Sequence, residues 1–318
     1  MSSKNIVLHI VISMLSWSCA LASAQDARPE EDRMALTIGF LHPLATNANR
    51  PNVTSSVDLS VLYGRVGTVE GLQLGGVVDY AARGITGVQL AGVGAITGGS
   101  ASGAQLAGVF NLSTGPTTGA QLAGVVNVAA DSVTGAQLAP VNIAGPVQGV
   151  QIGVVNIGRK VRGLQLGVIN IADEVDGAAI GLVSISRDSV HPVVWASNLQ
   201  YMNVGVKFST KYVFTLLGVH YGTHEADFDK VGLTFGLGGH LPLPARFDLE
   251  VQGSFTQLAP WKHGDKYKTN SWIAPQLAVG YSFASHFRVF AGAGVRVPLS
   301  VDLGRAVSRP EFLAGLQF

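Results

Sequence analysis

Eight copies of one short motif, Gly-x-Gln-Leu/Ile-Ala/Gly, run from Gly71 to about Ser186 and constrain the fold more than any other feature. A repeat at a nearly fixed period predicts stacked units of one supersecondary structure, and it argues against an enzyme active site in this third of the chain. The copies open at Gly71, Gly87, Gly103, Gly119, Gly135, Gly149, Gly163 and Gly177. The glutamine is kept in seven copies and replaced by Ala179 in the eighth: Gln73, Gln89, Gln105, Gln121, Gln137, Gln151 and Gln165.

The residue types within one copy predict bent β-strands. Val, Ile and Leu favour a pleated surface, and glycine at fixed places permits tight bends. The longer copies read Ala-Gly where the shorter ones read Gly alone, and an extra residue would invert every later side chain of a flat strand. A bend at the glycine absorbs that residue, which favours a β-solenoid with amide ladders formed by the glutamines and by Asn111, Asn127, Asn142, Asn156 and Asn170. The alternative is one larger membrane barrel that includes the repeats as strands.

The N-terminus has the pattern of an export signal. Lys4 precedes an apolar core from Ile6 to Leu15, and Ala22-Ser23-Ala24 forms a small-residue cleavage site. Cys19 is the only cysteine, so the chain after residue 24 has no disulfide and no thiol ligand; a lipoprotein role for Cys19 is the alternative. The charged fraction is only 13%, which gives no basic surface for nucleic acid. No later apolar run is long enough for a membrane helix, so any spanning must be by strands.

From about Asn198 the hydropathy alternates with period two, which predicts strands with one apolar and one polar face. In the segment 246–257, apolar Phe247, Leu249, Val251 and Phe255 alternate with Asp248, Glu250, Gln252, Ser254 and Thr256. Strands of about 10 residues match the length that crosses a membrane in a tilted barrel. Seven strands are predicted, at roughly 198–208, 211–221, 230–240, 245–257, 272–283, 286–297 and 311–318.

An even strand number is usual in such barrels, so the segment Met34 to His42 is predicted as an eighth strand that closes against the last one. The expected external loops are 222–229, 258–271 and 299–310. Aromatic residues near strand ends are expected at the membrane interfaces: Trp195, Tyr212, Tyr221, Trp272 and Tyr281.

The last residues, 311–318, are predicted to form a strand in which Phe312, Ala314, Leu316 and Phe318 share one face. This strand resembles the C-terminal signature of bacterial outer-membrane barrels, in which a terminal Phe is read by the insertion machinery. The resemblance implies outer-membrane lipid and that machinery as partners.

No catalytic, cofactor-binding or metal-ligating residue is predicted. His220, His224, Glu225, Asp227 and Asp229 are interpreted as a solvated loop, and 261–268 as a loop with an aromatic anchor. Ser254, His286 and Glu250 have no spacing that indicates a catalytic triad. Arg288 and Arg296 are expected to pair with Asp248 and Glu250 inside a closed barrel, because buried charges must be matched.

The Gly-x-Gln-Leu-Gly units followed by a barrel-like region resemble a family of bacterial surface-repeat proteins first catalogued in spirochaetes. The resemblance covers about residues 57 to 318 and implies an outer-surface or outer-membrane location. It implies no catalytic residues, and no activity transfers to particular positions.

Together these patterns predict an all-β protein with a glycine-rich solenoid-like module and an antiparallel outer-membrane barrel of about eight strands. The predicted segments are a signal peptide (1–24), an N-terminal segment with a first barrel strand (25–56), the repeat region (57–190) and the barrel region (191–318). The predicted function is a non-enzymatic structural or adhesive surface protein without cofactors. The alternatives are a porin-like channel whose wall includes the repeats, and an autotransporter with a repeat passenger. The sequence names no surface ligand.

Overall fold

The computed structural model describes residues 32–223, 226–260, 270–284, 287–299 and 307–318. The predicted signal peptide, with Cys19, lies outside these residues. The chain divides into two compact units, 1–118 and 119–318, and the repeats continue from the first into the second. Among the described residues, no helix is long and apolar enough to cross a membrane.

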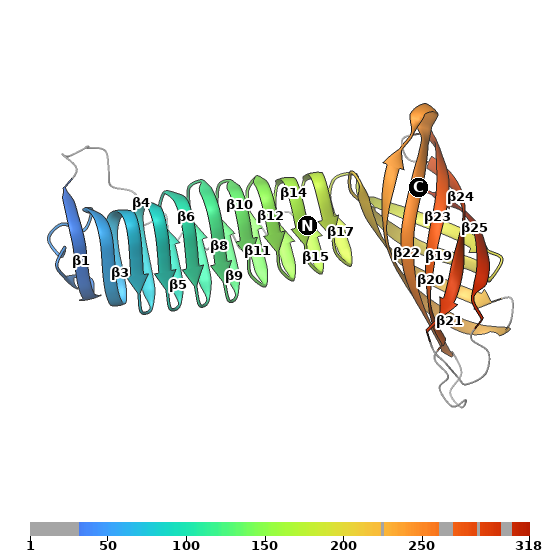
Figure 1. Cartoon of the computed structure of the whole chain (residues 1–318), viewed down its shortest axis with the longest axis horizontal. Helices are drawn as coiled ribbons and strands as arrows, with labels where there is room; N and C mark the ends of the chain where they lie inside the picture. Colours follow the sequence, from blue (N-terminus) through green and yellow to red (C-terminus); the bar gives the residue numbers. More distant parts are fainter. Residues whose placement is uncertain (1–31, 224–225, 261–269, 285–286, 300–306) are drawn as a thin grey trace, which may run out of the picture. The chain divides into compact units, whose positions relative to one another are not determined.

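The repeats form a parallel β-solenoid of alternating longer and shorter strands (Figure 1). The longer strand of a coil carries the Gln position of the motif, and the shorter strand carries the Asn position. The repeats are therefore not strands of a larger barrel. The first unit contains β1 (Arg33–Leu41), β2 (Leu44–Ala45), β3 (Thr54–Gly75), β4 (Val78–Ala91), β5 (Gly94–Thr97), β6 (Ser100–Ala107) and β7 (Phe110–Ser113). β8 (Thr117–Ala123) leads into the second unit, followed by β9 (Val126–Ala129), β10 (Val133–Leu138), β11 (Val141–Ala144), β12 (Val147–Ile152), β13 (Val155–Ile157), β14 (Lys160–Leu166), β15 (Ile169–Ile171), β16 (Glu174–Ile180) and β17 (Val183–Ile185).

Equivalent residues of successive coils lie directly beside one another. Gly135 pairs with Gly149, and Gln137 pairs with Gln151. The register survives the change of repeat length, since Asn142 still pairs with Asn127. The longer copies place their extra alanine at the end of the long strand, as Ala91 does in β4, before the glycine of the turn. A bend in the backbone therefore accommodates the extra residue, and the Gln and Asn side chains both stay in register with those of the neighbouring coils.

The segment 34–42 is not a barrel strand, which corrects the prediction. β1 pairs in parallel with β3 and begins the solenoid, with Thr37 beside Asp58. The physical reason is the polar face of β1: the hydroxyl group of buried Thr37 donates its hydrogen bond to Asp58 of β3. The alternating apolar residues of β1, Leu36, Ile38 and Phe40, are exposed on its outer side.

The C-terminal region is a closed antiparallel barrel of eight strands (Figure 1). The strands are β18 (Val190–Ser197), β19 (Gln200–Ser209), β20 (Val213–Thr223), β21 (Ala226–Pro242), β22 (Phe247–Pro260), β23 (Asn270–Ala284), β24 (Phe287–Pro298) and β25 (Arg309–Gln317), with a 3-10 turn, η1 (Pro244–Arg246), before β22. The eighth strand is β18, which closes the barrel by pairing Val194 with Leu316 of β25. The predicted loop 222–229 is also wrong for its larger part, because β20 and β21 extend to Thr223 and Ala226.

Candidate functional site

The glutamines of the repeat lie in the solenoid interior and form a directed hydrogen-bond ladder. In the first unit, Gln89 Nε2 donates to Gln73 Oε1 at 2.9 Å, and Gln105 Nε2 donates to Gln89 Oε1 at 2.9 Å. In the second unit, the same bond joins Gln137 to Gln121, Gln151 to Gln137 and Gln165 to Gln151, at 2.7, 2.8 and 2.8 Å. Each of these five bonds thus runs from the amide nitrogen of one coil to the amide oxygen of the preceding coil.

Asp58 gives this ladder its direction. Gln73 Nε2 donates to Asp58 Oδ2 at 2.9 Å. A carboxylate only accepts, so Gln73 must donate to it and offer its own oxygen to the next coil. At the other end Ala179 stands in register with Gln165, and Gln165 Oε1 has no hydrogen-bond partner among the described residues. Asp58 lies 15 residues before Gln73, which is close to the spacing between successive repeats. This spacing could have predicted from the sequence that Asp58 occupies the glutamine position of a preceding coil.

The asparagines form a second ladder of opposite direction. Asn127 Nδ2 donates to Asn142 Oδ1 at 3.0 Å, and Asn142 and Asn156 each donate to the asparagine of the next coil at 2.9 Å. Asn170 ends the run by donating to Ser184 Oγ at 3.2 Å. The same Nδ2 groups also bond carbonyl oxygens at the strand ends of the following coil, as Asn142 does with Ile152 at 2.9 Å.

We expect the Gln ladder to be a major source of solenoid stability. Gln151→Leu leaves the Gln137 oxygen and one Gln165 amide hydrogen without partners in a fully buried position. The expected loss is about 2–4 kcal/mol of unfolding free energy, since each buried unsatisfied group costs about 1–3 kcal/mol. Hydrogen exchange over 147–171 in the intact chain measures it. Gln148→Leu, on the exposed side of the same strand, should leave protection unchanged; equal effects at the two positions would contradict the role assigned to the ladder.

Asp79 occupies the Asn position of the first coil and carries a titratable group into the interior. Its Oδ1 accepts a hydrogen bond from Ser60 at 2.9 Å, whereas Oδ2 is buried without a partner in the described part of the chain. Burial, with a smaller contribution from the negative charge of Asp58, raises the pKa of Asp79 to about 7, although the Ser60 hydrogen bond lowers it. The folded coil therefore favours the protonated acid.

This raised pKa predicts a pH-dependent stability of the first unit. The folded state holds a proton that the unfolded chain releases near pH 3.8, so stability is greatest below that pH and falls until about pH 7. The expected change across this window is at most about 4 kcal/mol by linkage. Urea unfolding curves recorded at pH 4, 5.5 and 7.5 measure this change, with the loss of structure monitored by hydrogen exchange of the amides in residues 54–97. Asp79→Asn should flatten the profile, whereas Asp131→Asn, at an exposed turn, should not.

The outer face of the barrel is apolar, and the C-terminal strand contributes to it. Phe312, Ala314, Leu316 and Phe318 all point outward and are exposed. Other strands continue the surface with exposed side chains such as Leu233, Val251 and Leu277. A belt of this kind on a closed barrel is the pattern of a lipid-facing surface.

An arc of aromatic rings crosses the barrel end that contains Phe318. Successive ring contacts of 4.8 to 6.0 Å join Phe247, Tyr281, Phe283, Phe287 and Phe318. Tyr281 thus lies within a row of aromatic rings near the end of its strand.

Two of the predicted interfacial residues instead lie inside the barrel. Trp195 and Trp272 line interior cavities, and Trp272 packs under the Arg296 guanidinium at 4.4 Å. The alternation of β23 carried this signal, since Trp272 is in phase with the inward Gln276 and Ala278. Tyr212 and Tyr221 are exposed.

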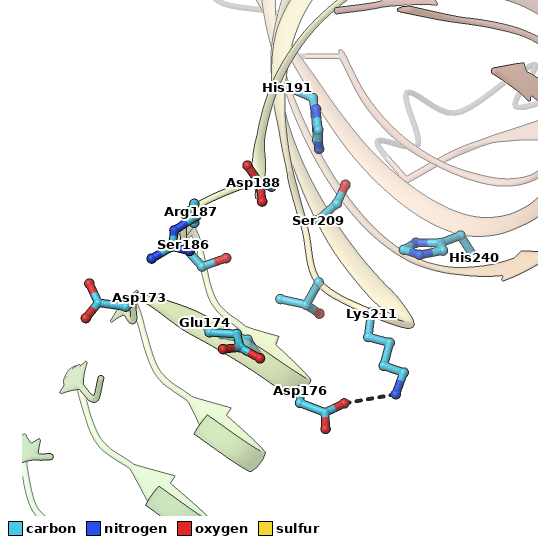
Figure 2. Close-up of a pocket in the computed structure, with 12 residues that line it drawn as sticks. Asp173, Glu174, Asp176, Ser186, Arg187, Asp188, His191, Ser209, Lys211 and His240 are labelled. Atoms are coloured by element: carbon cyan, nitrogen blue, oxygen red, sulfur yellow. Dashed lines mark hydrogen bonds and ion pairs between the residues drawn. The ribbon is translucent and has the colours of Figure 1, made fainter. Parts of the chain in front are cut away.

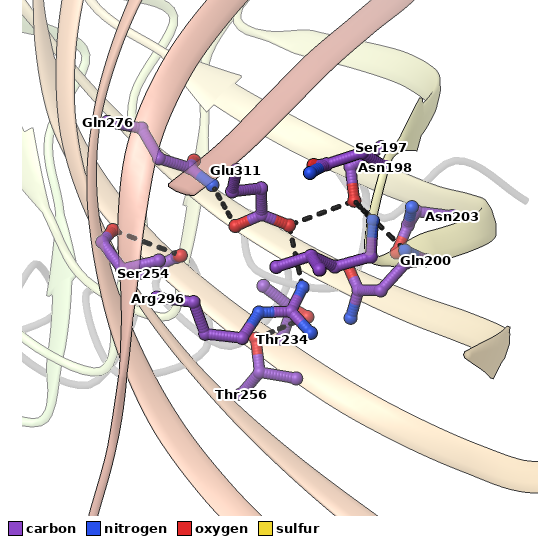
Figure 3. Close-up of polar contacts among 12 residues, drawn as sticks. Ser197, Asn198, Gln200, Asn203, Thr234, Ser254, Thr256, Gln276, Arg296 and Glu311 are labelled. Atoms are coloured by element: carbon purple, nitrogen blue, oxygen red, sulfur yellow. Dashed lines mark hydrogen bonds and ion pairs between the residues drawn. The ribbon is translucent and has the colours of Figure 1, made fainter. Parts of the chain in front are cut away.

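The barrel interior is filled by matched charges. Lys207 Nζ lies 2.8 Å from Glu250 Oε1, and both side chains are buried. Arg288 forms ion pairs with Asp248 and, at 3.1 Å, with Glu250. A second cluster is centred on Glu311, which binds Arg296 at 2.6 Å (Figure 3). The pairing predicted for Arg288 is therefore present, but that predicted for Arg296 is wrong, because β25 places Glu311 nearer.

Hydrogen bonds extend the Glu311 cluster across the interior (Figure 3). Ser197 Oγ donates to Glu311 at 2.9 Å, and Gln276 Nε2 donates to it at 3.1 Å. The interior cavities beside these charges are about 20 Å³ each. Such a volume holds roughly one water, so the interior resembles a packed polar core rather than an aqueous channel.

The remaining candidate residues are not brought together as a reactive site. His220 is fully buried inside the barrel, 5.9 Å from the Trp272 ring, rather than in a loop. Ser254 donates to the carbonyl oxygen of Ala274, and Glu250 binds Lys207. His224, Glu225, residues 261–268 and His286 lie outside the described residues, and the side chains of Asp227 and Asp229 are not described.

A cavity of about 560 Å³ in the second unit is open and polar (Figure 2). Its wall includes Asp173, Glu174 and Arg187, and an exposed ion pair of 2.9 Å joins Asp176 to Lys211. Exposed pairs of this kind contribute little stability. No group of three or more potential metal ligands occurs among the described residues.

No protein-family model matches the sequence, and no curated protein matches it. Two solved structures are similar to it. The N-terminal β-barrel domain of Pseudomonas aeruginosa OprF is 13% identical, with a TM-score of 0.32, over 42% of this chain and 98% of that one. Neisserial surface protein A is 12% identical, with a TM-score of 0.29, over 41% of this chain and 92% of that one.

Proposed function

We propose that this chain is a non-enzymatic structural protein of the bacterial outer membrane, in which a closed barrel anchors the amide-ladder solenoid. The main observation behind this proposal is that the barrel is apolar outside and charged inside, the reverse of a soluble protein. Its outer face is aliphatic and aromatic, while Lys207, Glu250 and Arg288 are paired inside. Only a lipid surrounding makes both faces favourable at once.

The filled interior supports an anchor in preference to a channel. The ion pairs and the Gln276–Glu311 hydrogen bond cross the space that a pore would need. The solenoid also removes the repeats from the barrel wall, so the wall is limited to eight strands, a number whose interior side chains can fill.

The connectivity of the barrel favours the periplasmic side for the solenoid. The repeats enter the barrel at Val190, beside the end of β25. The connections at that end, 210–212, 243–246 and 285–286, have two to four residues each. The two long connections, 261–269 and 299–308, are both at the other end, beside the two-residue connections 198–199 and 224–225. In bacterial barrels the short turns are periplasmic and the long loops are extracellular. An adhesive role would instead need the repeats outside the cell.

Fractionation and gel mobility test the anchor. We expect the protein in the outer-membrane fraction, with an electrophoretic mobility that changes on heating. Planar bilayers should show no stable conductance steps. A protein recovered only from the periplasmic extract would contradict the anchor, and regular conductance steps would favour a channel.

Protease treatment tests the side of the membrane. In intact cells we expect no cleavage within 84–176. After the outer membrane is permeabilised, cleavage should occur at the charged turns, such as that with Arg159 and Lys160. Cleavage there in intact cells would instead favour a surface-exposed, adhesive repeat module.

A further inference from the structure

In each of the two units, one edge of the solenoid is purely apolar on its outside. It consists of the turns that join the Gln strand to the Asn strand of each coil, and we call it the Gly-Val edge. Its turns are Gly76-Val77, Gly92-Val93 and Gly108-Val109 in the first unit, and Gly124-Val125, Ala139-Pro140, Gly153-Val154, Gly167-Val168 and Gly181-Leu182 in the second. Few soluble proteins present to water an aliphatic surface as extended as the one formed by the five turns of the second unit.

The coil half that contains this edge has its polarity reversed. In the coil at 150–157, Gln151 and Asn156 are fully buried. The outward side chains are aliphatic, with Ile152 40% and Val154 51% exposed. The neighbouring coils repeat this, with Leu138 and Leu166 exposed beside buried glutamines. The outward positions of this half carry no charge or amide in any coil between residues 72 and 185.

The opposite half of each coil follows the pattern of a soluble protein. Val147 and Val161 are buried in an aliphatic cluster, while Arg159 and Arg162 are exposed. Exposed charges of other coils, such as Asp131, Asp173 and Glu174, lie in the same half, near the turns that join one coil to the next. We call this part of the solenoid, with Arg159 and Arg162, the charged edge. Each coil therefore has one half suited to water and one half suited to hydrocarbon.

The backbone of the Gly-Val edge is also satisfied without water. Val154 N and Val155 N both donate to the carbonyl oxygen of Pro140, at 2.8 and 2.9 Å. Gly153 N donates to Leu166 O at 3.0 Å, and Asn156 Nδ2 donates to that same oxygen at 3.0 Å. Turns normally need water for such groups, and a turn without that need is compatible with a lipid interior.

We infer that the Gly-Val edge inserts into the hydrocarbon of one leaflet of a lipid membrane, with the charged edge in water. From Val150 through the turn at Val154 the outward side chains are apolar, over a length of at most about 13 Å at about 3.3 Å per residue, which fits within the roughly 15 Å of one leaflet. In the second unit, the outward side chains of this half between residues 120 and 185 are aliphatic and include no Trp, Tyr or Arg, the residues that anchor specific protein interfaces, which favours a fluid partner. The inference rests on the proposed function in one respect: the barrel brings the solenoid to a membrane.

Site-specific fluorescence in the full chain tests this inference. A Cys19→Ser background provides single cysteines at Val154 (Gly-Val edge), Arg162 (charged edge) and Leu233 (barrel exterior), each labelled with the polarity-sensitive dye NBD. The protein is reconstituted into phosphatidylcholine vesicles with and without doxyl-labelled lipid. We expect a blue-shifted emission and strong doxyl quenching at 154, comparable to 233 and severalfold above that at 162. Val168→Lys, on the edge of the next coil, should reduce quenching at 154, since a charge in hydrocarbon is costly, whereas Arg159→Leu should not.

The other outcomes separate this inference from the anchor. Quenching at 233 without quenching at 154 overturns the insertion and leaves the anchor intact. A blue shift at 154 that grows with protein concentration, without doxyl quenching, overturns it in favour of a second copy on the edge. Absence of quenching at both 154 and 233 overturns the insertion and the anchor together.

Discussion

Gly149→Ala is expected to break the solenoid at one coil, with a loss of about 4 kcal/mol or more. Gly149 has a φ of +140°, a region that residues with a Cβ rarely adopt. An added Cβ would also overlap the carbonyl oxygen of Gly135 in the coil beside it. The backbone strain costs about 1–3 kcal/mol, and separating the coils weakens ladder bonds worth about 1 kcal/mol each. Hydrogen exchange across 133–171 in the intact chain should lose protection.

Two alanine variants serve as controls for Gly149→Ala. Gln148→Ala changes the adjacent exposed residue and should leave protection unchanged. Gly253→Ala, in the barrel, adds a Cβ with no heavy atom within 4 Å. If Gly149→Ala reduced hydrogen-exchange protection no more than these controls, the explanation based on close stacking of the motif glycines would be wrong.

Glu250→Gln is expected to destabilise the barrel by about 3–5 kcal/mol, because it leaves the buried ammonium of Lys207 without its carboxylate. Arg288 would keep Asp248 but lose its contact with Glu250. The midpoint temperature of the heat-induced shift in gel mobility measures the effect and should fall clearly.

Matched variants separate this charge effect from a packing effect. The double variant Lys207→Met/Glu250→Met removes both charges and should recover a large part of the loss, since no uncompensated buried charge remains. Glu174→Gln breaks the exposed pair with Lys160, at 2.9 Å, and should change stability by less than about 1 kcal/mol. A fall as large for the double variant as for Glu250→Gln would contradict the charge explanation.

Much of the fold could be predicted because identical residues recur at identical phase. Gln137 and Gln151 occupy the same position in successive repeats, so stacking of the repeats places them side by side whatever the shape of the turns. The alternation in β22 likewise shows which side of the strand faces outward from the barrel, since exposed Phe255 and buried Glu250 differ in phase. In these cases a local pattern carries the three-dimensional information.

Other features depend on contacts between distant strands and left little local signal. β18 contains Pro192 and is short, so its alternation is weak, whereas β1 alternates well and belongs to the solenoid. The partner of Arg296 follows from the pairing of β24 with β25, which brings Glu311 beside Gly294. Periodicity within one strand does not contain that register.

The opposed directions of the two ladders have a consequence for evolution. A new coil inserted between 137 and 165 adds one glutamine dipole pointing toward the N-terminus and one asparagine dipole pointing toward the C-terminus. The electrostatic moment along the stack then stays small, whatever the number of coils. Asp58 and Ser184 stay as terminators, so neither end needs redesign. Duplication or loss of a coil is thus electrically neutral, and the length of the module is a property that selection can change in single steps.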